Sequence, residues 1–282
     1  MTKRVLIAGC GDVGLRVAQR LMARGERVLG LRRHVPQAAG VPMLAADLSD
    51  VDSLRALPDD IDQVVYLPTP GAREPAAYRA VFVDGLGHLL DALSAQRVRR
   101  WVWVSSSAVY GDHAGGWVDE TTPTAPPGFN GQVLLEGERL LAERLGQRAV
   151  VLRLAGLYGP GRAGLIERIA QGRAKAVREP AHWANRMHVD DAAAAIVHLL
   201  DLADPHALYL GVDDTPLPID VLYARIAQCL GVAVPAEGPA PAGVGSKRLS
   251  NARLRASGFV PRWPDAREGY AAQIKAMRAT AG

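Results

Sequence analysis

Cysteine is scarce in this chain, and long apolar runs are missing from it. The two cysteines, Cys10 and Cys229, lie too far apart to suggest a metal-ligand spacing or a disulfide framework. No stretch approaches the roughly 18 apolar residues of a membrane span. The opening residues, MTKRVLIAG, carry no long apolar run behind their charges, so no signal peptide is predicted. We therefore expect a reduced, cytoplasmic protein that holds no metal and does not enter a membrane.

Lysine is also scarce, and no dense basic stripe occurs. Only four of the 33 basic residues are lysines, and basic residues come at most in pairs such as Arg32–Arg33, although the net charge is +4. This spread argues against a nucleic-acid surface. The hydrophobic fraction of 49% is ordinary for a globular protein. A chain of 282 residues suffices for one large α/β unit, or for a core with a smaller appendage.

What is present is an alternation of apolar strands with amphipathic helices. Continuous apolar runs, typical of strands buried on both faces, occur at 4–9, 27–31, 41–48, 62–67, 101–104, 148–159 and 207–210. Helical spacing predicts helices at 12–25, 53–57, 75–96, 130–146, 192–203 and 218–231. This pattern predicts an α/β fold, a Rossmann-type doubly wound parallel sheet with a smaller C-terminal lobe.

The regular alternation weakens after residue 160, which suggests a domain organisation. The predicted dinucleotide-binding Rossmann core covers residues 1–160 and is completed by about 187–212. Residues 161–186 and 213–282 are then expected to form a smaller, substrate-side lobe. The Pro-, Gly- and Ala-rich segment 232–245 contains too many helix and strand breakers for regular structure, so we expect a loop there.

The segment GCGDVG places Gly9, Gly11 and Gly14 in the pattern G-x-G-x-x-G between a predicted strand and a predicted helix. In that context the first glycine allows a tight turn, the second lets a pyrophosphate approach the backbone, and the third lets the helix pack against the strand. The start of the helix, at Asp12 and Val13, would offer free N–H groups to the phosphates. The segment therefore predicts a dinucleotide site.

Two arginines stand where the second predicted strand ends. An NAD-binding protein usually presents an acid there to the ribose 2′-hydroxyl, yet residues 27–46 contain no Asp or Glu. The guanidinium groups of Arg32 and Arg33 suit a 2′-phosphate instead. We therefore predict NADP as the cofactor, with NAD as the alternative. Asp47 and Leu48 end the third predicted strand, where the adenine is expected.

Three consecutive serines follow a buried strand in VWVSSSAVYGD, residues 102–112. Serines can cap or turn a chain, and they can also meet a ligand at the end of a strand. The residues alone leave both interpretations open for Ser105, Ser106 and Ser107.

Five motifs run along the chain in a fixed order: GCGDVG, ADL, SSSAVYG, LRLAGLYGPGR and NRMHVDD. In this order the chain resembles the extended short-chain dehydrogenases/reductases, the NAD-dependent epimerase/dehydratase family. Its tail, SKRLSNARLRASGFVPRWPDAREGY, resembles a subgroup of small, atypical members. The resemblance implies an NAD(P)-binding protein. It also implies an oxidoreductase, epimerase or related enzyme that acts on a carbonyl or hydroxyl group of a small or nucleotide-linked substrate.

The resemblance implies roles for single residues. Ser106, or Ser107 if the strand ends one residue later, would hydrogen-bond the reacting oxygen of the substrate. Asn185, Arg186 and His188 match a segment that often contacts substrate in the family. The other positions expected beside the cofactor are Leu67, Pro68, Ser105 and, next to the nicotinamide carboxamide, Pro160.

The chain departs from the family at the catalytic pair, a Tyr followed four residues later by a Lys. When the chain is aligned with the family on the motif LEGERLL (135–141), Asn130 stands at the Tyr position and Leu134 at the Lys position. Neither side chain exchanges protons near neutral pH. Three alternatives stay open: an enzyme with another proton donor, a non-catalytic dinucleotide-binding regulator, or a partner subunit with a vestigial site. The candidate proton donors are Tyr66, Tyr158 and His188.

The expected partner is a small-molecule substrate, with nucleotide-linked compounds as one open class. Neither nucleic acid nor a membrane is expected as a partner. The resemblance leaves a homodimer open, since family members often pair through the two helices that correspond to 75–96 and 130–146.

Overall fold

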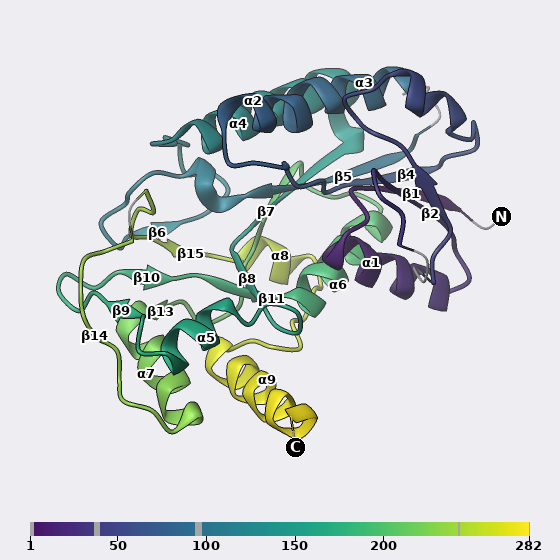
Figure 1. Ribbon diagram of the computed structural model, residues 1–282. Helices are drawn as coiled ribbons and strands as arrows, with labels where there is room; N and C mark the ends of the chain where they lie inside the picture. The colour runs from purple at the N-terminus through teal and green to yellow at the C-terminus, as the bar shows by residue number, and fades with distance from the viewer. Residues whose placement is uncertain (1–2, 37–39, 94–97, 242, 282) are drawn as a thin grey trace. The chain divides into compact units, whose positions relative to one another are not determined.

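The computed structural model describes residues 3–36, 40–93, 98–241 and 243–281 (Figure 1). The chain folds into two compact units, each assembled from three stretches of sequence. Unit 1 comprises Met1–Val109, Ala125–Arg153 and Ala193–Tyr209, and unit 2 comprises Tyr110–Thr124, Leu154–Ala192 and Leu210–Gly282.

Unit 1 is organised around a seven-stranded sheet with the order β12-β7-β5-β4-β1-β2-β3. Strand β1 pairs in parallel with β2 and with β4, and the pairs β2–β3 and β4–β5 are also parallel. The strand order therefore reverses at β1, and the predicted Rossmann-type doubly wound sheet is confirmed. The strands are β1 (Arg4–Ala8), β2 (Arg27–Arg32), β3 (Met43–Ala45), β4 (Gln63–Tyr66), β5 (Arg100–Ser106), β7 (Ala149–Leu154) and β12 (Leu208–Gly211).

Helices cover both faces of this sheet: α2, α3 and α4 lie over one face, and α1 and α6 over the other (Figure 1). Because no face meets water, the strands carry apolar residues continuously, and Val5–Ala8 and Val64–Tyr66 have no exposed surface. The helical segments are α1 (Asp12–Ala23), η1 (Asp52–Ala56), α2 (Pro75–Arg79), η2 (Ala80–Asp84), α3 (Gly85–Ala92), η3 (Ser107–Val109), α4 (Phe129–Leu145), η4 (Gly146–Arg148) and α6 (Val189–Asp201).

The helix predicted at 75–96 is interrupted by η2, a π-helical turn between α2 and α3. A π turn widens the helix by one residue and disturbs its regular hydrogen bonding. Here the buried hydroxyl of Tyr66 donates to the carbonyl of Val81 at 2.5 Å, so a side chain from β4 satisfies a carbonyl of the turn. Residues 94–97 of the prediction lie outside the described residues.

The single strand predicted at 148–159 is two strands. β7 ends at Leu154, and β8 (Gly156–Tyr158) instead pairs in parallel with β11 (Arg186–His188) in unit 2. The prediction was wrong because apolar residues continue from the buried β7 into β8, and such a run carries no signal where the chain changes sheet.

Unit 2 is built from pairs of short strands and four helices around its own core. Leu222 and Ile226 of α7 have no exposed surface and pack with Tyr158 and Tyr270. The segment expected to be a loop, 232–245, contains the two-residue strand β14, and its residue 242 is not described. The paired strands are β8–β11, β10 (Trp183–Ala184)–β13 (Leu217–Pro218), β9 (Lys175–Ala176)–β14 (Ala236–Glu237) and β6 (Trp117–Val118)–β15 (Arg248–Leu249). The helices are α5 (Gly164–Ala170), α7 (Ile219–Leu230), α8 (Ala252–Ala256) and α9 (Ala266–Ala281).

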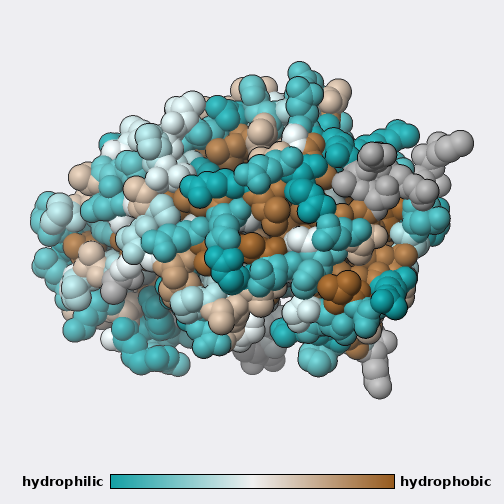
Figure 2. Space-filling model, turned by 90° about the horizontal axis from the view of Figure 1, so that it is seen from above, coloured by the Kyte–Doolittle hydropathy of each residue, from teal (hydrophilic) through white to brown (hydrophobic). Residues whose placement is uncertain are grey.

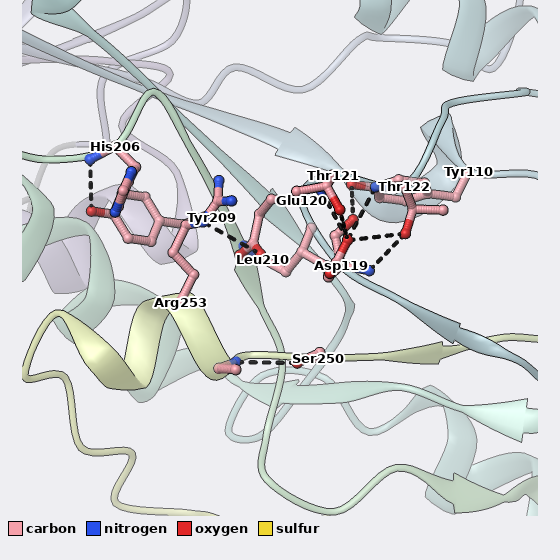
Figure 3. Close-up of polar contacts among 11 residues, drawn as sticks. Tyr110, Asp119, Glu120, Thr121, Thr122, His206, Tyr209, Leu210, Ser250 and Arg253 are labelled. Atoms are coloured by element: carbon pink, nitrogen blue, oxygen red, sulfur yellow. Dashed lines mark hydrogen bonds and ion pairs between the residues drawn. The ribbon is translucent and has the colours of Figure 1, made fainter.

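A turn held by the Asp119 carboxylate follows β6 in unit 2 (Figure 3). One carboxylate oxygen of Asp119 accepts hydrogen bonds from the backbone N–H and the hydroxyl of both Thr121 and Thr122. The side chain of the next residue, Glu120, is only 4% exposed, accepts the N–H of Leu210 at 2.9 Å and lies 3.7 Å from the guanidinium of Arg253. This segment is therefore anchored by its own carboxylates.

Figure 2 views the molecule from the side of α2–α4 and shows mostly hydrophilic side chains with smaller hydrophobic patches between them. Two ion pairs cross this helical layer: Arg79 pairs with Glu136 through two hydrogen bonds, and Arg144 pairs with Asp91 at 2.6 Å. Among the described residues, no helix is long and apolar enough to cross a membrane.

Candidate functional site

The loop after β1 requires a glycine at position 9. Its φ of 88° lies in the region that L side chains rarely adopt, and an added Cβ would come within 2.4 Å of the Pro68 backbone. The backbone N–H of Gly9 donates to the Leu31 carbonyl at 2.9 Å, so the turn is fixed between β2 and the segment after β4.

The other two glycines of the loop face different surroundings. An added Cβ at Gly11 would meet only the Gly9 carbonyl oxygen, at 3.9 Å, whereas one at Gly14 would lie 3.2 Å from that oxygen and from Cγ2 of Ile7. Gly11 therefore borders open space, and Gly14 lets α1 pack tightly. No side chain caps the start of α1, so its first N–H groups suit an anion.

A cavity of about 440 Å³ opens beside this loop, and unit 1 alone lines it. It brings together seven of the predicted cofactor residues: Gly9, Gly11, Arg32, Arg33, Asp47, Leu48 and Pro68. Asp12, Val13, Gly14, Leu67 and Ser105 belong to unit 1 but do not line the cavity, and the exposed Pro160 belongs to unit 2. Because Gly11 lines this cavity beside the uncapped start of α1, the backbone chemistry there suits a phosphate group.

Basic side chains dominate the rim of the cavity. Arg32, Arg33 and His34 follow β2, and Asp47 follows β3. The pKa of Asp47 is held below its usual range, first because its carboxylate accepts the backbone N–H of Ser49, and further because Arg33 and His34 lie nearby. Oδ1 of Asp47 accepts both the N–H and the hydroxyl of Ser49, at 2.9 and 2.8 Å. The two arginines thus suit a negatively charged group of a ligand, and the ionised Asp47 beside them can accept a hydrogen bond from it.

The first of the three serines has a structural role. The Ser105 hydroxyl donates to Oε1 of Glu138 at 2.6 Å, and Glu138 is in turn held by Arg153 through bonds of 3.0 and 2.6 Å. All three side chains are buried. The network joins the end of β5 to the middle of α4 and to β7, so it fixes the point at which the serine segment leaves the sheet.

The second and third serines remain half-buried where β5 passes into η3. Oγ of Ser106 accepts the backbone N–H of Ala108 at 3.2 Å, which caps this short turn. A hydroxyl that accepts one hydrogen bond can still donate its proton, so Ser106 retains the capacity to bind a ligand oxygen.

The start of α4 packs directly against this turn. An added Cβ at Gly131 would come within 2.6 Å of the Ala108 carbonyl oxygen. Asn130 is half-buried, whereas Leu134, at the position that matches the family's Lys, is only 4% exposed. The described part of α4 therefore presents no cation beside the serines.

Two of the three candidate proton donors are tyrosines without solvent exposure. Burial raises the pKa of Tyr66, whose hydroxyl is already engaged with Val81. In unit 2, burial raises the pKa of Tyr158, and an added Cβ at Gly269 would lie 2.1 Å from its hydroxyl. Both hydroxyls are thus held in packed surroundings.

The third candidate, His188, stands beside Tyr158 in unit 2. The two residues are partners in the β8–β11 pair, and their ring centroids are 5.1 Å apart in an edge-to-face arrangement. Nδ1 of His188 accepts the backbone N–H of Asp190 at 3.2 Å, and the indole of Trp263 lies against the imidazole at 5.2 Å. His188 is therefore oriented by its neighbours.

No pattern in the sequence had pointed to several residues of this site. His34 and Ser49 adjoin predicted positions, and the wall formed by Ala77, Ala80 and Val81 depends on η2, which helical periodicity does not reveal. The sequence motif LEGERLL contains Glu138, but no role was predicted for this residue. Its position could have indicated one, because a charged residue on the buried side of an amphipathic helix needs a partner.

A nucleotide loop at the switch point of a doubly wound sheet, with a basic rim and a serine turn, defines a dinucleotide-binding α/β protein. The model of the NAD dependent epimerase/dehydratase family matches residues 5–211, so the chain belongs to that family. Membership makes it a protein of the NAD-binding oxidoreductase/epimerase type and leaves its substrate undefined.

Known proteins agree with this assignment. Protein YeeZ of Escherichia coli (strain K12) is 33% identical over 243 residues, which cover 83% of this chain and 86% of YeeZ. A UDP-glucose 4-epimerase of Streptomyces lividans is 27% identical over 236 residues, which cover 73% of this chain and 70% of that protein.

Solved structures extend the likeness over the whole chain. A protein from Methylobacillus flagellatus, described provisionally as an NAD-dependent epimerase/dehydratase, has a TM-score of 0.84 at 39% identity and covers 99% of this chain and 100% of its own. The UDP-glucose 4-epimerase of Thermus thermophilus, solved in complex with NAD, has a TM-score of 0.80 at 25% identity and covers 98% and 99%.

Proposed function

We propose that this protein binds NADP in the cavity of unit 1 and is an enzyme that acts on a carbonyl or hydroxyl group of a small substrate. The observation that carries the proposal is the 440 Å³ cavity, which joins the open face of Gly11 to a rim with Arg32 and Arg33. Bound there, the cofactor would supply hydride transfer. The residues of this chain would bind it, orient the substrate and move a proton.

Each part of the cavity suits one part of the cofactor. The loop at Gly9 and Gly11, with the N-terminus of α1, would hold the pyrophosphate. Arg32 and Arg33 would hold the 2′-phosphate, because a guanidinium pairs with phosphate through two hydrogen bonds. Asp47 and Leu48 would border the adenine.

The substrate end is proposed from the serine turn and from the relatives. Ser106 would donate its hydroxyl proton to the reacting oxygen, with Ser107 as its neighbour. The Streptomyces lividans and Thermus thermophilus relatives are UDP-glucose 4-epimerases, so a nucleotide-linked sugar is the substrate class we favour. The hydroxyls of Tyr66 and Tyr158 are buried with raised pKa values, so we favour neither of them as the proton donor.

A second function, a non-catalytic dinucleotide-binding regulator, is favoured by one observation. The positions that match the family's Tyr and Lys hold Asn130 and the buried Leu134, which cannot exchange protons. In that case the cofactor would bind with the same preference and no substrate would turn over.

Fluorescence titration with NADPH and NADH tests the cofactor assignment. One charge-assisted contact to the 2′-phosphate is worth roughly 1.5–3 kcal/mol, so NADPH should bind about 10- to 100-fold more tightly at low salt. The preference should shrink as salt rises, because the rim is open to solvent. Replacing Arg32 and Arg33 by Ala should remove it. Equal dissociation constants for the two cofactors would contradict the assignment.

Turnover then separates the enzyme from the regulator. A panel of UDP-sugars and small carbonyl compounds is offered to the protein with NADPH or NADP⁺. Turnover that Ser106→Ala reduces, and that the exposed control Arg168→Ala leaves unchanged, supports the enzyme. Tight cofactor binding without any turnover favours the regulator.

A further inference from the structure

An arginine of unit 2 packs against two tryptophans. The Cζ atom of Arg248 lies 5.0 Å from the ring centroid of Trp117 and 4.8 Å from that of Trp183. The three residues come from β15, β6 and β10, and all of them belong to unit 2 (Figure 1). A guanidinium over an aromatic ring gains a cation–π attraction, so the two indoles help to hold the cation.

Backbone contacts orient the same arginine. Its Nε donates to the carbonyl of Gly115 at 2.7 Å, and its backbone N–H donates to the carbonyl of Gly116 at 2.9 Å. An added Cβ at Gly115 would lie 2.9 Å from Nε1 of Trp183, so a glycine lets this indole approach the loop closely. The guanidinium of Arg248 is therefore oriented before any ligand binds, which lowers the entropic cost of binding.

The two terminal nitrogens of Arg248 are left for a ligand. Within the part of the chain that the structure describes, neither Nη1 nor Nη2 has an acceptor, and neither is buried. No carboxylate in that part pairs with this arginine. A guanidinium binds a carboxylate or a phosphate through two parallel hydrogen bonds. With Nε engaged, the pair Nη1 and Nη2 remains for such a contact.

The neighbouring charges also favour an anion. The next residue towards the N-terminus, Lys247, is buried, and its Nζ donates to the carbonyls of Gly111 and Gly245, both at 3.3 Å. The carboxylate of Asp112 lies near Lys247 and accepts two backbone N–H groups. Arg248 and Lys247 thus outnumber the one carboxylate of these segments.

Trp117 adds an open aromatic surface. Its residue is 59% exposed although Arg248 lies against its ring, whereas Trp101 and Trp103 have no exposed surface. An indole buries much apolar area when another ring packs on it. A ring attached to an anion at Arg248 can therefore pack on the open part of Trp117.

We propose that Arg248 and Trp117 form a binding site for a small organic anion. Its carboxylate or phosphate group accepts hydrogen bonds from Nη1 and Nη2 of Arg248, and its ring packs on Trp117. This site lies within unit 2 and shares no residue with the nucleotide cavity of unit 1. It therefore does not depend on the proposed cofactor.

NMR of the ¹⁵N-labelled full chain tests the proposal, with phenyl phosphate, benzoate and inorganic phosphate titrated at constant ionic strength. The indole N–H signals of Trp117 and Trp183, assigned by replacing each with Phe, should shift and saturate. Those of the buried Trp101 and Trp103 should stay in place. Phenyl phosphate should bind about 3- to 10-fold more tightly than inorganic phosphate, because only phenyl phosphate brings a ring. Its affinity relative to benzoate shows which of the two anionic groups the site prefers.

Variants assign the binding to the guanidinium. Arg248→Met keeps an apolar chain against the indoles and removes the donors, so it should bind phenyl phosphate at least about tenfold more weakly. Arg262→Met is the matched control, since Arg262 also lies over an indole, 5.6 Å from the centroid of Trp263, but is exposed. It should bind phenyl phosphate as the native protein does. Unchanged signals of Trp101 and Trp103 show that a variant is folded.

Three outcomes would overturn the proposal. The first is the absence of saturable shifts with every probe. The second is a folded Arg248→Met variant with native affinity, and Arg248→Gln serves in its place if the Met variant does not fold. The third is an equal loss of affinity in Arg262→Met, which would mean attraction to positive charge in general. If phenyl phosphate binds no more tightly than inorganic phosphate, the contact with Trp117 is wrong. The titration with NADPH tests the cofactor separately.

Discussion

The Tyr66 hydroxyl donates a hydrogen bond to the Val81 carbonyl at 2.5 Å, and this contact joins β4 to the π-helical turn η2. The turn begins at Ala80, and Ala80 and Val81 both form part of the cavity wall. Tyr66 also packs edge-to-face on Trp103, with ring centroids 6.2 Å apart. A residue that the sequence suggested as a proton donor is therefore placed to shape the nucleotide cavity.

Tyr66→Phe should destabilise unit 1. The ring remains, but the Val81 carbonyl loses its buried partner, which costs about 1–3 kcal/mol. Urea unfolding followed by Trp fluorescence measures the loss. Tyr78→Phe is the control, because Tyr78 belongs to the same aromatic group but is partly exposed. A Tyr66→Phe variant as stable as the native protein would show that the hydroxyl does not support η2.

Gly9→Ala should disrupt the loop after β1 more strongly than the same change at another glycine with a positive φ. Gly25 has a similar φ of 79°, but an added Cβ there meets nothing within 4 Å, whereas at Gly9 it meets the Pro68 backbone at 2.4 Å. Gly25→Ala should therefore cost only the backbone term of about 1–2 kcal/mol.

Unfolding in urea and titration with NADPH compare the two variants. Gly9→Ala should lose more stability than Gly25→Ala and should also lose cofactor affinity, because the turn that carries Gly11 must move. Equal losses of stability, with affinity retained in both variants, would contradict the close approach at Gly9.

The buried strands of the sheet and the cofactor loop were predictable because their signals are local. Apolar runs mark strands buried on both faces, and G-x-G-x-x-G between a strand and a helix marks the phosphate turn. Arg32 and Asp47 could be placed in the cavity because parallel strands present their carboxyl ends at one edge.

The rest depended on contacts between segments far apart in sequence. The π turn relies on Tyr66, which lies 15 residues before Val81, and periodicity within the helix does not report it. The structural role of Ser105 depends on Glu138, 33 residues further on. Three adjacent serines look equivalent in the sequence, and only the buried carboxylate distinguishes the first from the other two.

Glu138→Ala should be among the most destabilising single changes in unit 1. It leaves the buried Arg153 guanidinium without its carboxylate, and breaking a buried ion pair costs about 3–5 kcal/mol. Glu136→Ala is a matched control, since Glu136 lies on the same helix and pairs with Arg79 through two similar bonds, but its side chain is 44% exposed, whereas Glu138 is buried. A pair that solvent reaches in this way contributes little to stability.

Urea unfolding at constant pH measures both Glu variants. A loss for Glu138→Ala no larger than that for Glu136→Ala would mean that burial adds nothing to this pair. In that case Ser105 would not need the network to hold its place, and Ser105→Ala should be equally harmless.

Asp213 should make the protein less stable as the pH rises. Burial, aided by the nearby Asp265 and Asp214, raises the pKa of Asp213 to about 8, whereas an unfolded Asp titrates near pH 4. Between these values the folded state holds a proton that the unfolded state lacks, so the free energy of unfolding falls with rising pH. One proton corresponds to a slope of at most about 1.4 kcal/mol per pH unit.

Asp213→Asn removes this proton and keeps an oxygen that can accept the N–H of Thr215, which the native carboxylate accepts at 3.3 Å. Its free energy of unfolding should therefore depend less on pH between about 4 and 8. Relative to the native protein, the variant should gain most stability near pH 8, where the native carboxylate loses its proton while remaining buried. Urea unfolding at pH 5.5, 7 and 8.5 measures the slope. Asp214→Asn should change the profile only slightly, because the Asp214 charge is the smallest of the contributions to the raised pKa of Asp213. A native protein and an Asp213→Asn variant with parallel pH profiles would show that Asp213 is ionised in the folded state at neutral pH.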